Sequence, residues 1–197
     1  MNPLKSVTGT IVTGFVLAII ALGVMGFDKI NAINMEVWFH VMAGVTWIGL
    51  LYYFNFVQVP GVGQALAEAD NGGPGPAAIN KYVAPRALLW FRWAAVVTWL
   101  TGVGALQNLQ AGGALKAFMF SDGMEVIGLG AWLGTIMLFN VWVFIWPNQK
   151  KILGIVESTP EAIAKGKVVA LMASRTNTVL SIPMLLTMVG YAHGLSF

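Results

Sequence analysis

The chain has 197 residues, of which 57% are hydrophobic and only 10% are charged, and its mean hydropathy is +0.75. Soluble domains carry about 25% charged residues, so this composition excludes an ordinary soluble domain. The absence of cysteine excludes disulfides, iron–sulfur clusters and covalent haem attachment through a CxxCH sequence. The eleven basic residues form no continuous stripe of the kind that binds nucleic acids.

Five segments are apolar and long enough to cross a bilayer core, which takes about 20 helical residues. We therefore predict an all-α integral membrane protein, a single domain over residues 1–197 with five transmembrane helices in a bundle. The predicted spans are 9–27, 35–59, 87–106, 124–146 and 173–192, and residues 60–86 and 147–172 are the predicted cytoplasmic loops. The alternative for the first span is a signal peptide, but its apolar stretch is longer than usual and no small-residue cleavage site follows closely. We expect it to be retained.

Local signals mark several helix ends. Asn71–Pro76, NGGPGP, indicates a turn, and Pro147 is expected to end the fourth helix. Thr159 precedes Pro160 and Glu161, which is typical of an N-cap followed by proline and an acid in the first helical turn.

The basic residues predict the orientation of the bundle. With five spans, only Lys29 and Lys116 fall on one side of the membrane, and all other lysines and arginines fall on the opposite side or at its helix ends. Acidic residues are divided evenly between the sides. Because positive residues accumulate in cytoplasmic loops, the N-terminus is predicted inside and the C-terminus outside.

The second span carries its polar atoms on one helical face, because they follow one another at steps of three or four residues. This face consists of His40, Gly44, Trp47, Leu51, Asn55 and Gln58. Polar groups that face lipid are costly, so we expect this face to point toward other helices or a cofactor.

The chain has two histidines, His40 and His193, and the predicted topology puts both near the outer surface. Two imidazoles at a similar depth on separate helices suit the two axial positions of a non-covalent haem b. Glycines lie at the same level, and among the nearby residues Gly44 and Trp47 are candidate cofactor contacts. Other interpretations remain open: the glycines serve close helix packing, and the histidines are packing residues, a metal site or part of a proton relay.

A second polar cluster is predicted near the cytoplasmic helix ends. Its members are Asn55, Gln58, Arg86, Arg92, Asn140, Arg175 and Asn177. One interpretation is that they cap helices and extend their charged ends to the membrane surface. The other is a binding site for an anionic or amide-rich small molecule or a quinone headgroup, with the arginines as cationic contacts.

Three stretches, Phe39–Pro60, Gly134–Ile152 and Ser174–Val189, resemble the membrane domain of bacterial cytochrome-c-type urate oxidase, or urate hydroxylase. The shared features are H-x-x-x-G-x-x-W-I-G, N-V-W with P-N-Q, and S-R-x-N-x-x-x-S-x-P. The resemblance implies a haem-linked redox domain of the bacterial inner membrane, with His40 matching the family's early histidine. The urate-oxidising members also carry a cytochrome c domain, for which this cysteine-free sequence has no counterpart.

Two functional hypotheses follow. In the first, a haem b membrane protein, which oxidises urate or another substrate, passes electrons to a separate cytochrome c or a quinone. In the second, the chain is a cofactor-free structural or accessory subunit of a larger membrane complex. A transporter is a third possibility, but the sequence shows no internal repeat.

Overall fold

The computed structural model describes residues 2–195, and within them it contains helices and no strand. Its α-helices are α1 (Val7–Met25), α2 (Ala32–Tyr53), α3 (Val59–Ala69), α4 (Ala84–Leu109), α5 (Gly113–Phe118), α6 (Glu125–Phe139), α7 (Trp146–Ile152) and α8 (Pro160–Ala192). Three π-helical turns, η3 (Phe54–Gln58), η4 (Ile79–Val83) and η5 (Asn140–Ile145), connect some of these helices, and η1 (Pro3–Lys5) and η2 (Phe27–Lys29) are short 3₁₀ turns at the ends of α1.

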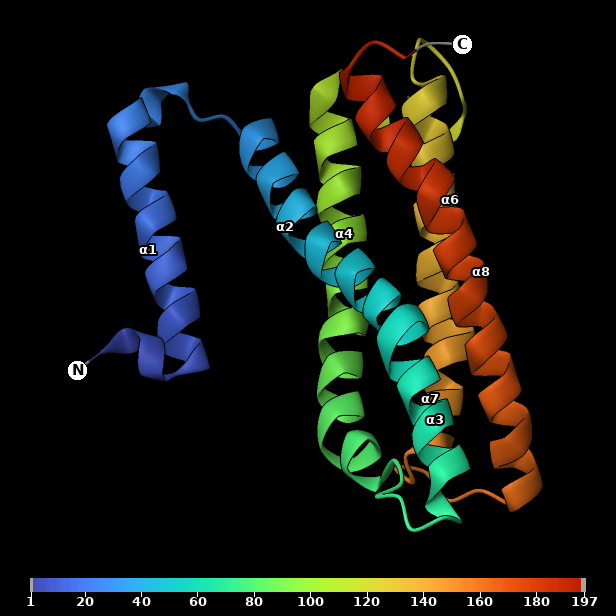
Figure 1. Cartoon of the computed structure of the whole chain (residues 1–197). Helices are drawn as coiled ribbons and strands as arrows, with labels where there is room; N and C mark the ends of the chain where they lie inside the picture. The colour runs from blue at the N-terminus through green and yellow to red at the C-terminus, as the bar shows by residue number, and fades with distance from the viewer. Residues whose placement is uncertain (1, 196–197) are drawn as a thin grey trace.

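Five continuous helical segments are long and apolar enough to cross a membrane, as the sequence predicts. They are Val7–Met25, Ala32–Ala69, Ile79–Leu109, Glu125–Ile152 and Pro160–Ala192. The last four form a bundle in which α2 crosses α4, and α6 lies beside α8 (Figure 1). The fold is thus an all-α membrane bundle, and its orientation stays a prediction.

The first helix stands apart from this bundle (Figure 1). None of the residues of α1 is buried, although the helix is highly apolar. The ring of Phe15 meets that of Trp38 on α2 edge to face, with 5.9 Å between centroids. The α1 helix therefore adds almost nothing to the core, and lipid or another partner must cover most of its apolar surface.

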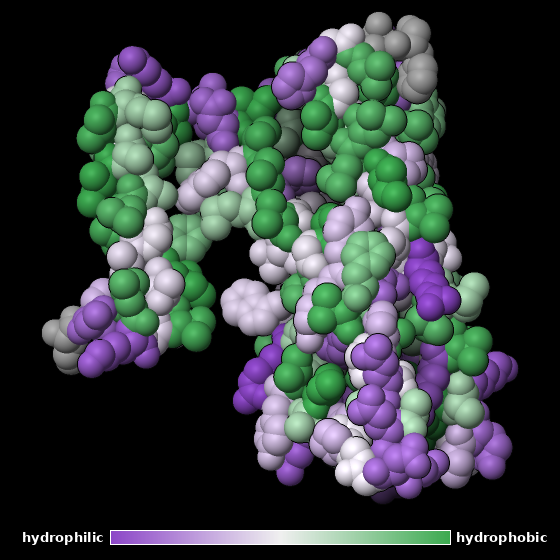
Figure 2. Space-filling model, viewed as in Figure 1, coloured by the Kyte–Doolittle hydropathy of each residue, from purple (hydrophilic) through white to green (hydrophobic). Residues whose placement is uncertain are grey.

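The main core lies where the four bundle helices meet. Trp47 and Leu51 of α2 pack with Phe91 of α4, Met137 of α6 and Val141 of η5, and all five are almost completely buried. Figure 2 shows hydrophobic residues over the upper part of the visible face and more hydrophilic residues over the lower end of the bundle.

The bundle helices continue through three prolines, of which Pro147 is the one that the sequence suggests as a helix end. Pro60, Pro85 and Pro147 each lie two residues after the end of a π-helical turn, η3, η4 and η5 respectively. A proline in a helix lacks an N–H and crowds the carbonyl group four residues earlier. The wider π turn relieves this crowding, so the chain stays helical across each proline.

The prediction that the fourth helix ends at Pro147 is therefore wrong, because the helix runs on to Ile152. Likewise, residues 60–86 and 147–172 are mostly helical rather than loops, and only residues 70–76 and 153–159 lie outside helices there. The start of the last helix is confirmed: the Thr159 side chain accepts a hydrogen bond from the Ala162 N–H, and Pro160 is the first helical residue.

Candidate functional site: the seam between α2 and α4

His40 lies at the seam between α2 and α4. Its Nδ1 is 2.7 Å from the backbone carbonyl oxygen of Thr98 on α4. A Cβ atom built on Gly102 would come within 2.8 Å of the His40 ring, at both Cε1 and Nδ1. The absence of a side chain at Gly102 thus lets the imidazole lie against the backbone of α4.

The partner of Nδ1 determines which nitrogen carries the proton. A carbonyl oxygen can only accept a hydrogen bond. In neutral His40 the proton is therefore on Nδ1, and this N–H donates a hydrogen bond to the carbonyl oxygen of Thr98. The other nitrogen, Nε2, then has a free lone pair, and no hydrogen bond of residues 2–195 uses it. Histidines that bind metals are commonly oriented by such a bond from the second ring nitrogen.

The seam continues toward the N-terminus of α2 with Glu36, one helical turn before His40. The Asn108 amide donates a hydrogen bond to Glu36 Oε2 at 2.8 Å, and the carboxylate lies over Gly104 of α4. Glu36 is not among the site residues that the sequence predicts. Its spacing of four residues from His40 is the signal that placed it on the same helical face.

The prediction that the polar face of the second span points inward is confirmed for its central residues. Gly44 lies against Thr98, and Trp47 and Leu51 are buried in the core. These residues fill space between protein helices, and their role as cofactor contacts stays a prediction.

His193 lies in a different environment, at the end of α8. It is exposed, and its Nδ1 is 2.8 Å from the carbonyl oxygen of Val189 in its own helix. The same argument as for His40 leaves Nε2 of His193 as the free nitrogen. The end of α8 lies beside the start of α6, where the Tyr191 hydroxyl donates to Sδ of Met124, the residue before α6. No contact described in residues 2–195 joins the two histidines, so their binding of one haem stays a prediction.

The glycines near this level contact protein atoms. Gly128 of α6 approaches the carbonyl of Ala117 in α5, and Gly130 faces Thr187 of α8. Gly190 lies against the side chain of Leu195. Close packing of the helices explains these glycines without a porphyrin.

The predicted cytoplasmic-side residues separate into two groups in the structure. Asn55, Asn140 and Asn177 join helices: Asn55 Nδ2 donates to Ser174 Oγ at 2.8 Å, and Asn140 Nδ2 donates to Asn177 Oδ1 at 2.8 Å. Asn177 also donates to the carbonyl of Met137 at 2.9 Å. These bonds, two buried and one half-buried, connect η3, η5 and α6 to α8, which fits a structural role.

The three arginines do not join this asparagine network. Arg86 donates to the carbonyl of Tyr82 in its own helix, Arg92 stacks on Trp146, and Arg175 is exposed. Gln58 Oε1 and Asn55 Oδ1 are buried without a hydrogen-bond partner. The seven residues therefore do not form one compact site.

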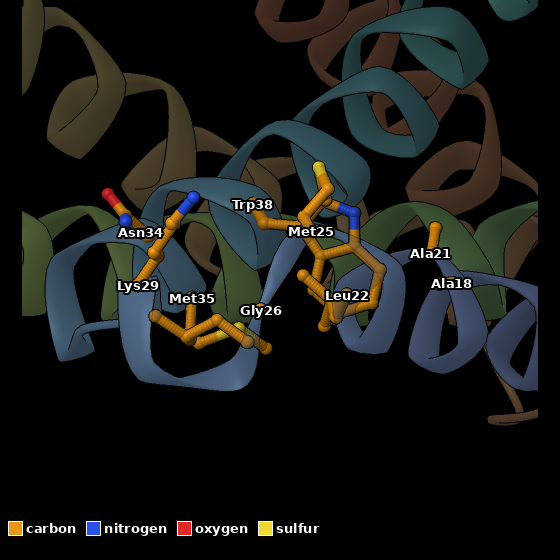
Figure 3. A pocket seen from close by; sticks show the side chains of 10 residues that line it. Ala18, Ala21, Leu22, Met25, Gly26, Lys29, Asn34, Met35 and Trp38 are labelled. Carbon is orange, nitrogen blue, oxygen red and sulfur yellow. The ribbon is translucent and has the colours of Figure 1, made fainter.

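Two of the cavities in the structure lie apart from the His40 seam. The first, of about 530 Å³, lies between α1 and α2, with apolar walls that include Leu22 and Trp38. Lys29 and Asn34 lie together at one of its ends (Figure 3). The second, of about 540 Å³, lies where α8 ends beside the start of α6 and is lined by Tyr191 and Glu125. Neither lining includes a histidine, but Ala192 and Gly194, the two neighbours of His193 in the chain, line the second cavity.

Within residues 2–195, no group of three or more histidine, aspartate or glutamate side chains lies close enough together to hold a metal ion. These residues therefore contain no metal site built from such side chains alone. Haem would need only axial ligands, since its four equatorial nitrogens belong to the porphyrin. The free Nε2 atoms of His40 and His193 are suitable axial donors.

The fold defines the class: a polytopic α-helical membrane protein with a histidine at a helix–helix seam. Residues 109–197 match the family model described as the urate oxidase N-terminal domain. The resemblance that the sequence predicts is thereby confirmed for the part of the chain from the end of α4 onward. No curated protein and no solved structure matches the chain.

Proposed function

We propose that this protein is a membrane redox domain that binds haem b without a covalent link and passes electrons to a separate cytochrome c or a quinone. The main support for the proposal is the position of His40. Its Nδ1 is hydrogen-bonded to the Thr98 carbonyl, so the Nε2 lone pair is available to bind iron. The similarity of residues 109–197 to the urate oxidase N-terminal family supports a redox role. That matched part includes His193, the second candidate ligand.

Each residue of the seam has a definite task in this proposal. The Thr98 carbonyl fixes the tautomer and direction of the imidazole, and hydrogen bonding of this kind also strengthens the ligand. Gly102 keeps the ring close to α4. The surrounding apolar helices exclude water, which influences the redox potential. A bound haem would supply one-electron transfer, with His40 and His193 as the residues that would hold it.

The proposal is tested by the pyridine haemochrome content and the reduced-minus-oxidised spectrum of the detergent-purified protein. We expect about one haem per chain if both histidines serve one group, and loss of most of it in His40→Ala. A matched control is Val45→Ala, since Val45 lies on the same helix and is 70% exposed. An unchanged haem spectrum in His40→Ala contradicts the proposal, as does a wild-type protein that binds no haem after reconstitution.

His193→Ala separates two forms of the proposal. Conversion to a five-coordinate, high-spin spectrum supports His193 as the second ligand, whereas an unchanged low-spin spectrum assigns that position to another residue.

The alternative is a cofactor-free accessory subunit of a larger membrane complex. The observation that favours it is the unpartnered α1, none of whose residues is buried. This function predicts that the protein co-purifies with a large complex and that both histidine variants behave like the wild type.

A further inference from the structure

Two cationic side chains, Arg92 and Lys150, lie near the ring of Trp146 on the predicted cytoplasmic side of the bundle. The guanidinium carbon of Arg92, on α4, lies 3.8 Å from the ring centroid of Trp146, on α7. The ammonium nitrogen of Lys150, one helical turn further along α7, lies 6.0 Å from the same centroid. Stacking on an indole holds the guanidinium plane in place and leaves its edge free to donate hydrogen bonds.

These two charges have no acidic partner. The one ion pair among residues 2–195 joins Lys116 and Asp122, at a Nζ–Oδ2 distance of 3.2 Å. No hydrogen bond described for the same residues uses the donors of Arg92 or Lys150. Both cations lie within 6.0 Å of one ring centroid and repel each other, so this arrangement favours an anion bound beside them.

A tryptophan pair lies close to the cations, because Trp93 follows Arg92 on α4 and Trp142 lies about one helical turn before Trp146. Trp93 of α4 packs edge to face on Trp142 of η5, with 5.5 Å between ring centroids. The side chains of Trp90 and Trp93 are 57% and 52% exposed. Because α4 belongs to a segment that is apolar enough to span a membrane, these exposed rings face lipid, and tryptophans of this kind gather at the level of the headgroups.

We propose that Arg92, Trp146 and Lys150 bind the phosphate of an anionic phospholipid from the cytoplasmic leaflet, with an acyl chain along the rings of Trp93 and Trp142. A lipid uses both features, since its phosphate meets the two cations and its hydrocarbon meets the exposed rings. A free phosphate ion uses only the cations. Arginine and lysine both bind phosphate oxygens, and arginine does so through paired donors.

The test compares binding of phosphatidylglycerol and phosphatidylcholine with identical acyl chains to the full chain in detergent, measured by native mass spectrometry. The wild type is expected to prefer phosphatidylglycerol. Each basic group near an anionic membrane surface contributes about a fivefold change in binding, so Arg92→Gln with Lys150→Gln is expected to weaken this preference about 30-fold.

The matched control is Lys165→Gln with Lys167→Gln, which removes the same charge near the start of α8, where both residues are exposed. This control is expected to keep the preference. Arg92→Lys keeps the charge but not the paired donors and is expected to lie in between. Lys150→Gln alone provides a milder variant, and circular dichroism of each variant verifies its helical fold.

Three results would overturn the assignment. The first is an unchanged lipid preference in the Arg92 and Lys150 double variant. The second is an equal loss in the control, which means that any cytoplasmic cation suffices. The third is complete competition by millimolar inorganic phosphate, which means that the site binds free phosphate rather than lipid.

Discussion

Gly102→Ala tests how closely His40 lies against α4. The new Cβ would come within 2.8 Å of the imidazole at two atoms, Cε1 and Nδ1. Atoms at this separation overlap, so the ring has to move and its bond to the Thr98 carbonyl is weakened. Because Nδ1 is hydrogen-bonded at 2.7 Å, the imidazole has little freedom to turn away without losing that bond.

The expected change in the free energy of unfolding combines three contributions. Overpacking a tight contact costs about 1–3 kcal/mol, and a lost side-chain hydrogen bond within a membrane bundle costs about 0.6 kcal/mol. Alanine is favoured over glycine in a helix by about 0.5–1 kcal/mol. The net result for Gly102→Ala is a destabilisation of roughly 1–3 kcal/mol.

Gly49→Ala is the matched control, because a Cβ at Gly49 of α2 would meet no atom within 4 Å. That variant is expected to be as stable as the wild type or more stable by up to about 1 kcal/mol. Unfolding by titration with sodium dodecyl sulfate, followed by tryptophan fluorescence, measures both variants. If Gly102→Ala is as stable as Gly49→Ala, the contact between His40 and the backbone of α4 does not exist in the folded protein.

Two further predictions concern α8 and its contacts. Asn177→Ala removes the partner of Asn140 and a donor to a carbonyl of α6, and we expect it to lower the free energy of unfolding by about 1–3 kcal/mol. Thr176→Ala, at an exposed neighbouring position, is expected to change it by less than about 0.5 kcal/mol, and equal effects of the two variants would contradict the role of the asparagine pair. Thr159→Ala deletes the N-cap of α8, at a cost of about 0.5–2 kcal/mol. Amide hydrogen exchange should then speed up in the first turn around Ala162 and not elsewhere, whereas protection like that of the wild type refutes the cap.

The sequence was sufficient for the features that depend on local chemistry. Apolar length predicts the five helical segments, and the step of three or four residues predicts that Trp47 and Leu51 face the core. The start of α8 follows from Thr159 and Pro160. The prediction that the helix ends at Pro147 was wrong. The residue pattern does not reveal the π turn before Pro147, which relieves the clash between the proline ring and the preceding turn.

The candidate site was less predictable than the helices. The position of His40 on an inward face follows from its spacing. Its partner, however, is the backbone carbonyl of Thr98, and because every residue has a backbone carbonyl, the sequence does not indicate which one His40 meets. Which carbonyl it meets depends on how α2 crosses α4. The contact with Gly102 has the same origin, since many glycines in this chain would serve equally well until the crossing point is known.

The isolation of α1 has a consequence for how the protein responds to its membrane. The tilt of a helix that packs on neighbours is set by those neighbours, whereas the tilt of a helix surrounded by lipid follows the thickness of the bilayer. The four bundle helices belong to the first kind and α1, which buries no residue, belongs to the second. Where lipid surrounds α1, we therefore expect a change in bilayer thickness to alter the tilt of α1 more than that of the bundle helices, and to change the width of the cavity beside Trp38.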